Sequence, residues 1–273
     1  MKIYTDDFLF HCKFEKNLSK KTITAYGIDL NQFNCFCNHS EHVTGIQEID
    51  KNVLKHYLES IMLKFKPKTV KRKMATLKAF FNFIQFEDET HINPFNKLRI
   101  RIKEGKRVPR TIDPLIIKTL YEHLYAQKAI IKKDSYSYGV ITRDIAVVEL
   151  LFATGLRVSE LSHLKESEID FSENTLRING KGNKERLVPI CNPDAIESLN
   201  TYYNLFYDKI IKTEYFFINR LQKRLSEQSI RFMIKKYISD LNINKNITPH
   251  MFRHSIATML LENHENRGQA NYT

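Results

Sequence analysis

Glycine and proline are scarce in this chain, which has eight glycines and seven prolines among 273 residues. Because these two residues interrupt helices and form tight turns, their scarcity favours long helical segments. Long hydrophobic runs are also lacking, since the longest, IAVVELLFA at 145–153, is interrupted by Glu149 and falls short of the ~20 residues that span a bilayer. The N-terminal sequence carries acids and an early cation where a signal peptide needs an uninterrupted apolar core. We therefore expect a soluble, cytoplasmic protein with no membrane partner.

Cysteine is scarce as well, and its four copies are too few and too clustered for a disulfide framework in a chain this long. The segment CFCNHSEH brings Cys35, Cys37, His39 and His42 together in sequence, but a CxC spacing suits tetrahedral zinc poorly. Its neighbouring phenylalanines instead place it on a core-facing helix, so we expect packed or solvated side chains there.

Charge of one sign is in excess, because 43 lysines and arginines against 31 acids give a net charge of +12 and a pI near 9.4. A chain this basic usually binds a polyanion, with nucleic acid as the first candidate, although a lysine-rich surface without that role is the alternative. Hydrophobic residues make up 42%, enough for real cores, and the length suggests two domains.

Helical spacing dominates the first part of the chain. Apolar residues recur on one face of three segments, TITAYGIDLNQFNCF, DKNVLKHYLESIMLKF and KTVKRKMATLKAFFNFIQF, and Ser19 is placed to cap the first of them. We predict that residues 1–100 form a helical domain of four or five helices. Residues 101–112, within a basic segment with no sustained periodicity, are the predicted linker.

The second predicted domain covers residues 113–273. It is helical apart from TLRINGKGNKERLVPI at 175–190, which alternates on both sides of a glycine-containing turn and predicts a β-hairpin. The sequence thus indicates a mainly α protein with a small antiparallel sheet in its second domain.

Acids are absent between Glu59 and Glu87, a window that holds seven cations. Cations and backbone N–H groups at a helix start can hold a phosphate together, and such a window is less typical of a merely solvated helix face. We expect two helix starts to contact DNA phosphates through Lys20, Lys21, Thr22, Lys68, Thr69, Lys71 and Arg72.

Three separated motifs carry candidate chemistry. In ATGLRVSEL, a glycine ends one helix and Arg157 begins the next, beside free N–H groups that suit an oxyanion. In GKGNKER, Lys181 lies at the hairpin tip, and in PHMFRH, Pro249 starts a helix on which His250 and Arg253 share a face.

Together these side chains suit a phosphodiester, because guanidinium groups clamp non-bridging oxygens while a lysine and a histidine assist proton transfer. The pattern has no partnered carboxylate and no acid cluster for Mg²⁺, so a two-metal nuclease is not expected. His250 and His254 have the spacing of a helical zinc pair, but Met251 stands where a zinc protease needs glutamate. We expect no metal and no cofactor.

These motifs, in this order and behind a basic helical domain, resemble the tyrosine recombinases, which include the phage-type integrases and the Xer recombinases. The resemblance covers nearly the whole chain. It implies a SAM-like core-binding domain joined to a catalytic domain of the DNA breaking-rejoining fold. It also implies that a tyrosine attacks the scissile phosphate, becomes linked to the DNA 3′ end and releases a 5′-hydroxyl.

The resemblance implies that the catalytic residues of this chain are Arg157, Lys181, His250 and Arg253, with Lys181 as general acid. It implies that His254 is a packing residue. It further implies two protomers on inverted half-sites of duplex DNA, four in a synapse as a homo- or hetero-oligomer, and a role in DNA integration or in chromosome partition at cell division.

The sequence departs from the family pattern after Arg253, because the expected Gly-His motif and the late helix with the tyrosine do not follow. Tyr272 comes too early and lies in a polar segment. We therefore expect a truncated or frameshifted gene that lacks the nucleophile segment. The alternative function is a DNA-binding remnant or regulator that occupies recombination sites without cutting them.

Overall fold

A computed structural model describes residues 2–43, 45–89, 91–103, 105, 111–180, 185–245 and 247–258. The chain divides into two compact units, Met1–Arg107 and Val108–Thr273. The division falls inside the segment 101–112, which is the predicted linker. Each unit has its own hydrophobic core.

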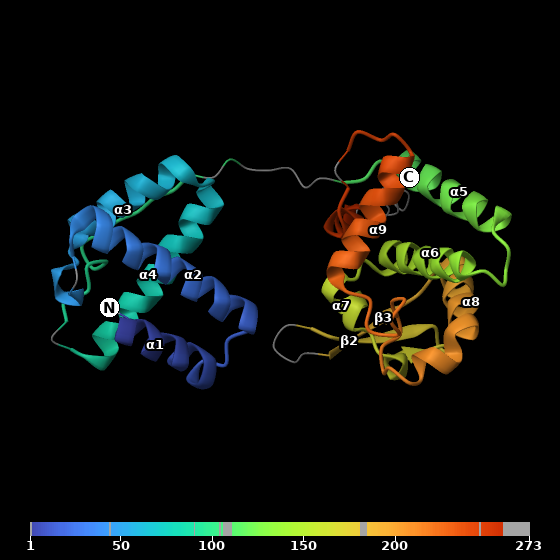
Figure 1. Ribbon diagram of the computed structural model, residues 1–273, viewed down its shortest axis with the longest axis horizontal. Helices are drawn as coiled ribbons and strands as arrows, with labels where there is room; N and C mark the ends of the chain where they lie inside the picture. The colour runs from blue at the N-terminus through green and yellow to red at the C-terminus, as the bar shows by residue number, and fades with distance from the viewer. Residues whose placement is uncertain are drawn as a thin grey trace, which may run out of the picture. The chain divides into compact units, whose positions relative to one another are not determined.

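The first unit is a helical bundle (Figure 1). Its α-helices are α1 (Lys2–Phe10), α2 (Lys20–Phe36), α3 (Lys51–Lys64) and α4 (Pro67–Glu87). Single π-helical turns, His11–Glu15 and Cys37–Glu41, follow α1 and α2, and a 3-10 turn spans Ile46–Glu48. The apolar periodicity of the sequence predicts α2, α3 and α4 but not α1. The apolar residues of α1 give a weak helical pattern, because among them only Phe8 is buried.

The residue at or next to the N-cap determines where α2, α3 and α4 begin. The Ser19 hydroxyl accepts a hydrogen bond from the Thr22 N–H at 3.2 Å, which confirms the predicted cap of α2. The Asp50 carboxylate caps α3 through the N–H groups of Asn52 and Val53. Helix α4 begins at Pro67, whose missing N–H is no loss at the first helical position.

The apolar face predicted for α4 forms much of the core. The apolar residues that recur on this face are all buried: Val70, Met74, Leu77, Phe80, Phe81 and Ile84. They pack with Leu30 and Phe33 of α2 and with Val53, Leu54, Tyr57 and Ile61 of α3.

The second unit contains more helices and one small sheet. Its α-helices are α5 (Pro114–Ile130), α6 (Tyr136–Thr154), α7 (Val158–His163), α8 (Pro193–Ile210) and α9 (Glu227–Asp240), and residues 249–258 are also helical. A 3-10 turn, Glu166–Glu168, precedes the sheet. The strands β1 (Ile169–Asp170), β2 (Thr175–Asn179) and β3 (Glu185–Pro189) are antiparallel in that order.

Helix α6 is the centre of this unit, and α5 and α8 pack against it (Figure 1). Its segment from Ile145 to Leu151 is entirely buried. This explains why the sequence there reads as a nearly continuous apolar run rather than a one-sided helix. The predicted hairpin is confirmed, with Ile178 opposite Arg186, whereas β1 was not predicted because two residues leave no pattern. Along the described residues, no helix combines the length and apolarity that crossing a membrane requires.

Candidate active site

The turn between α6 and α7 sets the position of the first candidate arginine. Helix α6 ends at Gly155, whose φ of +60° is left-handed and whose N–H bonds the Leu151 carbonyl at 3.0 Å. Residues with a Cβ adopt this conformation only with strain, so glycine suits the position. Two residues later, Arg157 is the N-cap of α7, as predicted.

The Arg157 side chain is held by a carboxylate. Its Nη1 donates to Glu160 Oε1 at 2.7 Å, and its backbone N–H donates to Glu160 Oε2 at 2.9 Å. Arg186 of β3 donates to the same two oxygens, at 3.2 Å from Nη1 and 2.8 Å from Nη2. We call Arg157, Glu160 and Arg186 the Glu160 cluster.

The Glu160 cluster corrects one expectation. The prediction of a site without a partnered carboxylate is wrong, because Glu160 pairs with two arginines. The pairing with Arg157 follows from a glutamate three residues after the N-cap, which is the spacing of a capping box.

The Glu160 carboxyl is 7% exposed. Burial alone would raise its pKa, but the hydrogen bonds from Arg186 and from the N–H and guanidinium of Arg157 outweigh burial and lower the pKa below its ordinary value. Glu160 is therefore ionised at neutral pH and keeps both guanidinium groups oriented. Their own side chains stay partly exposed, 47% for Arg157 and 36% for Arg186, so they can still meet a ligand.

The helix at 249–258 brings the second candidate arginine to the same turn, and it begins at Pro249 as predicted. Arg253 Nη1 donates to the Gly155 carbonyl at 2.8 Å, and a Cβ at position 155 would lie 3.7 Å from Arg253 Cγ. The structure thus joins two motifs that are about a hundred residues apart in sequence, because the segment from Gly155 to Arg157 carries one arginine and binds the other.

A buried serine ties the same helix to the start of the second unit. The Ser255 hydroxyl accepts a hydrogen bond from the Ile112 N–H at 2.7 Å and donates to the Met251 carbonyl at 2.9 Å. Both Ser255 and Ile112 are buried. This contact fixes the helix that carries His250 and Arg253.

The other predicted site residues differ in their surroundings. His250 is exposed on the helix at 249–258. His254 is exposed too, so its predicted packing role is wrong. The predicted catalytic residue Lys181 lies outside the described residues, as does Tyr272.

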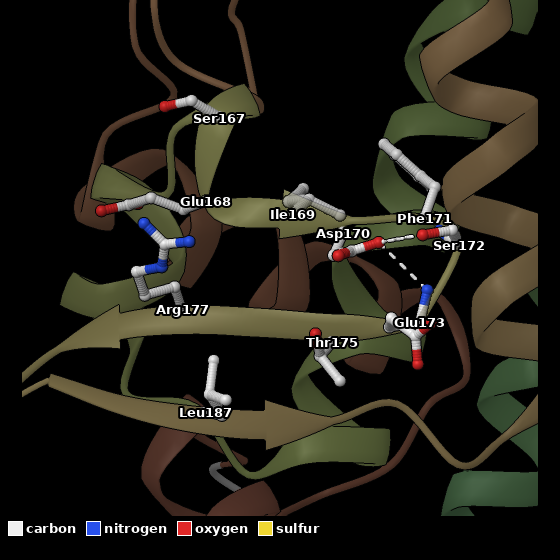
Figure 2. Close-up of a pocket in the computed structure, with 10 residues that line it drawn as sticks. All are labelled: Ser167, Glu168, Ile169, Asp170, Phe171, Ser172, Glu173, Thr175, Arg177 and Leu187. Carbon is white, nitrogen blue, oxygen red and sulfur yellow. Dashed lines mark hydrogen bonds between the residues drawn. The ribbon is translucent and has the colours of Figure 1, made fainter.

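Two pockets lie near the sheet, and none of the described candidates Arg157, His250 and Arg253 lines either of them. A groove of about 240 Å³ between α7 and β2 is lined by Glu160 and His163, so it borders the Glu160 cluster. A larger pocket of about 680 Å³ covers β1 and its turn (Figure 2). There the Asp170 carboxylate accepts hydrogen bonds from the N–H and hydroxyl of Ser172 and from the Glu173 N–H, as Figure 2 shows. This carboxylate shapes its own turn.

The predicted DNA-contacting residues of the first unit lie at the first turns of α2 and α4. Five are exposed cations, Lys20, Lys21, Lys68, Lys71 and Arg72, and two are partly buried threonines, Thr22 and Thr69. Arg72 also donates from Nη1 to Asp29. Lys73, one of the seven cations of the acid-free window, is 2% exposed and is bonded to the same aspartate.

The described part of the chain has no group of three or more His, Cys, Asp or Glu residues placed to hold a metal ion. In the CFCNHSEH segment the side chains diverge: Cys37 is buried, Cys35 is exposed, and the His39 ring bonds the Cys35 carbonyl at 2.9 Å. All four cysteines of the chain are free thiols.

Family models match both units. The model described as Phage integrase family matches residues 125–267, and the model described as Phage integrase, N-terminal SAM-like domain matches residues 5–87. A protein named tyrosine recombinase from Agathobacter rectalis is 40% identical over 262 residues, which cover 96% of this chain and 84% of that protein. Tyrosine recombinase XerD of Halalkalibacterium halodurans is 34% identical over 260 residues, covering 94% and 83%. Tyrosine recombinase XerC of Pediococcus pentosaceus is 32% identical over 255 residues, covering 91% and 81%.

Solved structures share the fold. The XerH site-specific recombinase bound to its difH substrate before cleavage aligns with a TM-score of 0.71 at 21% identity, over 95% of this chain and 74% of that one. A lambda integrase dimer bound to a COC′ core site aligns with a TM-score of 0.69 at 15% identity, over 94% and 88%. The predicted fold class, a SAM-like helical domain and an α-rich domain with a small antiparallel sheet, is confirmed. The chain belongs to the phage integrase family of tyrosine recombinases and is a site-specific recombinase.

Proposed function

We propose that the second unit holds the scissile phosphate of duplex DNA between Arg157 and Arg253 and that the DNA is cut and rejoined through a 3′-phosphotyrosine intermediate. The observation that carries this proposal is the turn from Gly155 to Arg157. One arginine is fixed there by Glu160, and the other by the Gly155 carbonyl.

Two fixed guanidinium groups suit phosphoryl transfer, because negative charge on the non-bridging oxygens grows in the transition state. Each guanidinium has five N–H donors in a planar fork, and the contacts to Glu160 and Gly155 use Nη1 of each arginine. The remaining donor positions match phosphate oxygens in a bidentate arrangement. Anchoring the side chains beforehand lowers the cost of orienting them during the reaction.

Proton transfer is assigned to Lys181 and His250. A tyrosine oxygen attacks phosphorus, the bond from phosphorus to the 5′ oxygen breaks, and Lys181 donates the proton that makes the leaving group a hydroxyl. His250, exposed on the same helix as Arg253, accepts the proton that the tyrosine hydroxyl loses as it attacks. In the reverse step a second 5′-hydroxyl attacks and the tyrosine is released, so the bond energy is retained without a cofactor.

The first unit would grip the DNA. Lys20, Lys21 and Thr22 open α2, and Lys68, Thr69, Lys71 and Arg72 lie in the first turns of α4. Cations at two helix starts supply phosphate contacts that set the position of the protein on the duplex. We further propose that residues 101–112 link the two DNA-binding parts.

The relatives suggest the assembly. The lambda integrase neighbour is described as a dimer on a core site, and a related structure as a tetramer on a Holliday junction. We propose that this chain likewise acts as two protomers on inverted half-sites and four in a synapse. The Xer relatives favour chromosome dimer resolution, and so chromosome partition, as the setting, with action in the cytoplasm, where free thiols persist.

Binding and cutting can be tested separately. Binding sites are first selected from a pool of randomised duplexes, and the dissociation constant of the selected duplex is then measured at several salt concentrations. We expect affinity to fall by about 10³ or more between about 50 and 200 mM salt if six or more phosphates are contacted. Absence of salt-dependent affinity for any duplex would overturn the proposal.

The catalytic roles are tested on a nicked form of the selected duplex. Arg253→Ala should keep most of the affinity and lose about 10²–10³ in cleavage rate. Arg177→Ala, which removes an exposed arginine of β2 outside the Glu160 cluster, is the control and should cleave at the normal rate. Unchanged cleavage by Arg253→Ala would refute the assigned role.

A further inference from the structure

A buried carboxylate lies where α2 packs on α4 in the first unit. Asp29 of α2 is 1% exposed. It accepts hydrogen bonds from Lys73 Nζ at 2.9 Å, from the Thr76 hydroxyl at 3.0 Å and from Arg72 Nη1, all three on α4. We call these four residues the Asp29 cluster.

The charges of the Asp29 cluster do not balance. One carboxylate faces two cations, Lys73 and Arg72, so the cluster carries a net charge of +1. Lys73 is 2% exposed and has Gln32 Oε1 and the Phe65 ring as its further neighbours, neither of which supplies a negative charge. A buried ammonium is costly unless it is fully compensated, and here the Asp29 carboxylate that Lys73 bonds is shared with Arg72.

Arg72 is the exposed cation of the Asp29 cluster. The Arg72 side chain is 45% exposed, although Arg72 Nη1 bonds the buried Asp29 carboxylate. A guanidinium offers five donors in a rigid fork, whereas the bond to Asp29 is made by Nη1. Arg72 also lies within the first two turns of α4, close in sequence to Lys68 and Lys71. One side chain can thus bond the aspartate inside and an anion outside.

We propose that the Asp29 cluster is half of a phosphate site, in which Asp29 positions Arg72 and a DNA phosphate supplies the missing negative charge. The proposal rests on the proposed function, since it takes the ligand to be duplex DNA bound by the first unit. It makes Asp29 and Lys73 positioning residues for DNA binding, although neither touches the DNA. It also distinguishes Arg72 from the neighbouring lysines, which act as point charges.

The competing explanation is that the cluster only ties α2 to α4. In that case the exposed part of Arg72 contributes no more than any surface cation, and a lysine would replace it without loss. The two explanations therefore differ for substitutions that keep the charge.

The first experiment uses two opposite conservative substitutions, with the dissociation constant of the selected duplex measured against salt. Arg72→Lys should weaken binding about tenfold, because a lysine ammonium drawn to Asp29 cannot also reach the phosphate. The slope of log affinity against log salt should fall by about 1, the value for one lost phosphate contact. Lys55→Arg, at an exposed lysine of α3 outside the predicted DNA contacts, is the control and should bind like the unaltered protein.

The second experiment removes the inner pair. Asp29→Asn combined with Lys73→Met deletes one negative and one positive charge, so the net charge of the chain is unchanged and no uncompensated ammonium is left buried. We expect about a tenfold loss of affinity, because Arg72 loses its anchor. The single variant Asp29→Asn should weaken DNA binding if Asp29 positions Arg72. If the cluster only ties α2 to α4, the same variant should tighten DNA binding, because removing a negative charge by itself favours a polyanion.

The outcomes are distinct. If the unaltered protein binds no duplex, the proposed function fails and the inference with it. If it binds and Arg72→Lys has unchanged affinity and salt slope, the inference alone is overturned. Circular dichroism of each variant without DNA shows whether the fold is kept. If the double variant of Asp29 and Lys73 is unfolded, the comparison of Arg72→Lys with its control decides between the two explanations.

Discussion

Replacing Glu160 by glutamine should destabilise the second unit by about 2 kcal/mol near pH 7. The side chain accepts four hydrogen bonds, from the N–H and Nη1 of Arg157 and from Nη1 and Nη2 of Arg186. Glutamine keeps one acceptor oxygen and turns the other into a donor, so donors from both arginines lose their acceptor. Hydrogen bonds to charged groups are worth about 1.5–3 kcal/mol each. Because both guanidinium groups keep water contact, we expect less than the full cost of breaking a buried ion pair, about 3–5 kcal/mol.

The pH dependence of this effect has a definite sign. The pKa of Glu160 is lowered in the folded protein, because hydrogen bonds from Arg186 and Arg157 outweigh its burial. The stabilisation is therefore complete above the ordinary pKa of 4.5 and is lost as pH falls through the folded-state pKa. The difference between the unaltered protein and Glu160→Gln should shrink in acid.

Urea unfolding followed by far-ultraviolet circular dichroism, at a series of pH values, measures both effects. The matched control is Glu168→Gln, because Glu168 makes the same cap, through the Lys165 N–H at 2.9 Å, without pairing an arginine. If Glu160→Gln costs no more than Glu168→Gln at neutral pH, or if its cost does not change in acid, the assigned role is wrong. In a cleavage assay, the loss of orientation at Arg157 should cost about a hundredfold in rate.

Three further variants test other parts of the second unit. Burial raises the pKa of Glu149 despite a hydrogen bond from the Tyr125 hydroxyl. The free energy of unfolding of the unaltered protein should therefore fall, relative to that of Glu149→Gln, as pH rises above 4.5. Parallel pH profiles of the two proteins in urea unfolding would contradict this. Gly155→Ala should lower stability by about 1–2 kcal/mol, since φ is +60° there and the nearest side-chain atoms are at ordinary contact distance; an unchanged thermal midpoint would rule out backbone strain. Ser255→Ala should cost about 1–3 kcal/mol by leaving the buried Ile112 N–H unpaired, and Ser255→Thr should restore most of it if the hydroxyl is what matters.

Local chemistry explains which parts of the fold were predictable. The cap at Ser19, the glycine at 155 and the proline at 249 each act within a few residues, so the sequence shows where those helices begin or end. The face of α4 was predictable for the same reason, because one side of a long helix is apolar. Helix α1 and strand β1 were missed, since one has a weak pattern and the other has only two residues.

The candidate site was predictable in its members but not in its contacts. The motifs identify Arg157 and Arg253, yet nothing in the sequence shows that Arg253 bonds the Gly155 carbonyl, which lies 98 positions away. The pairing of Arg186 with Glu160 likewise depends on β3 passing beside α7. In the first unit, the burial of Lys73 was missed because a lysine in a basic segment is usually exposed, and its partner Asp29 lies on another helix.

A covalent-adduct assay tests the central claim most directly. The protein is incubated with its selected duplex, nicked so that the cleaved strand diffuses away, and protein–DNA adducts are resolved on a denaturing gel. Arg157→Ala, Arg253→Ala and Tyr272→Phe are run in parallel, the last to determine whether Tyr272 is the attacking residue. The proposed function predicts an adduct that forms with the unaltered protein and is lost when either arginine is removed, against the sequence-based expectation that the nucleophile segment is missing. A complex on a native gel with no adduct on the denaturing gel would contradict the proposed cutting and favour the alternative, a DNA-binding remnant or regulator. An adduct that persists in Arg253→Ala would contradict the role of that arginine.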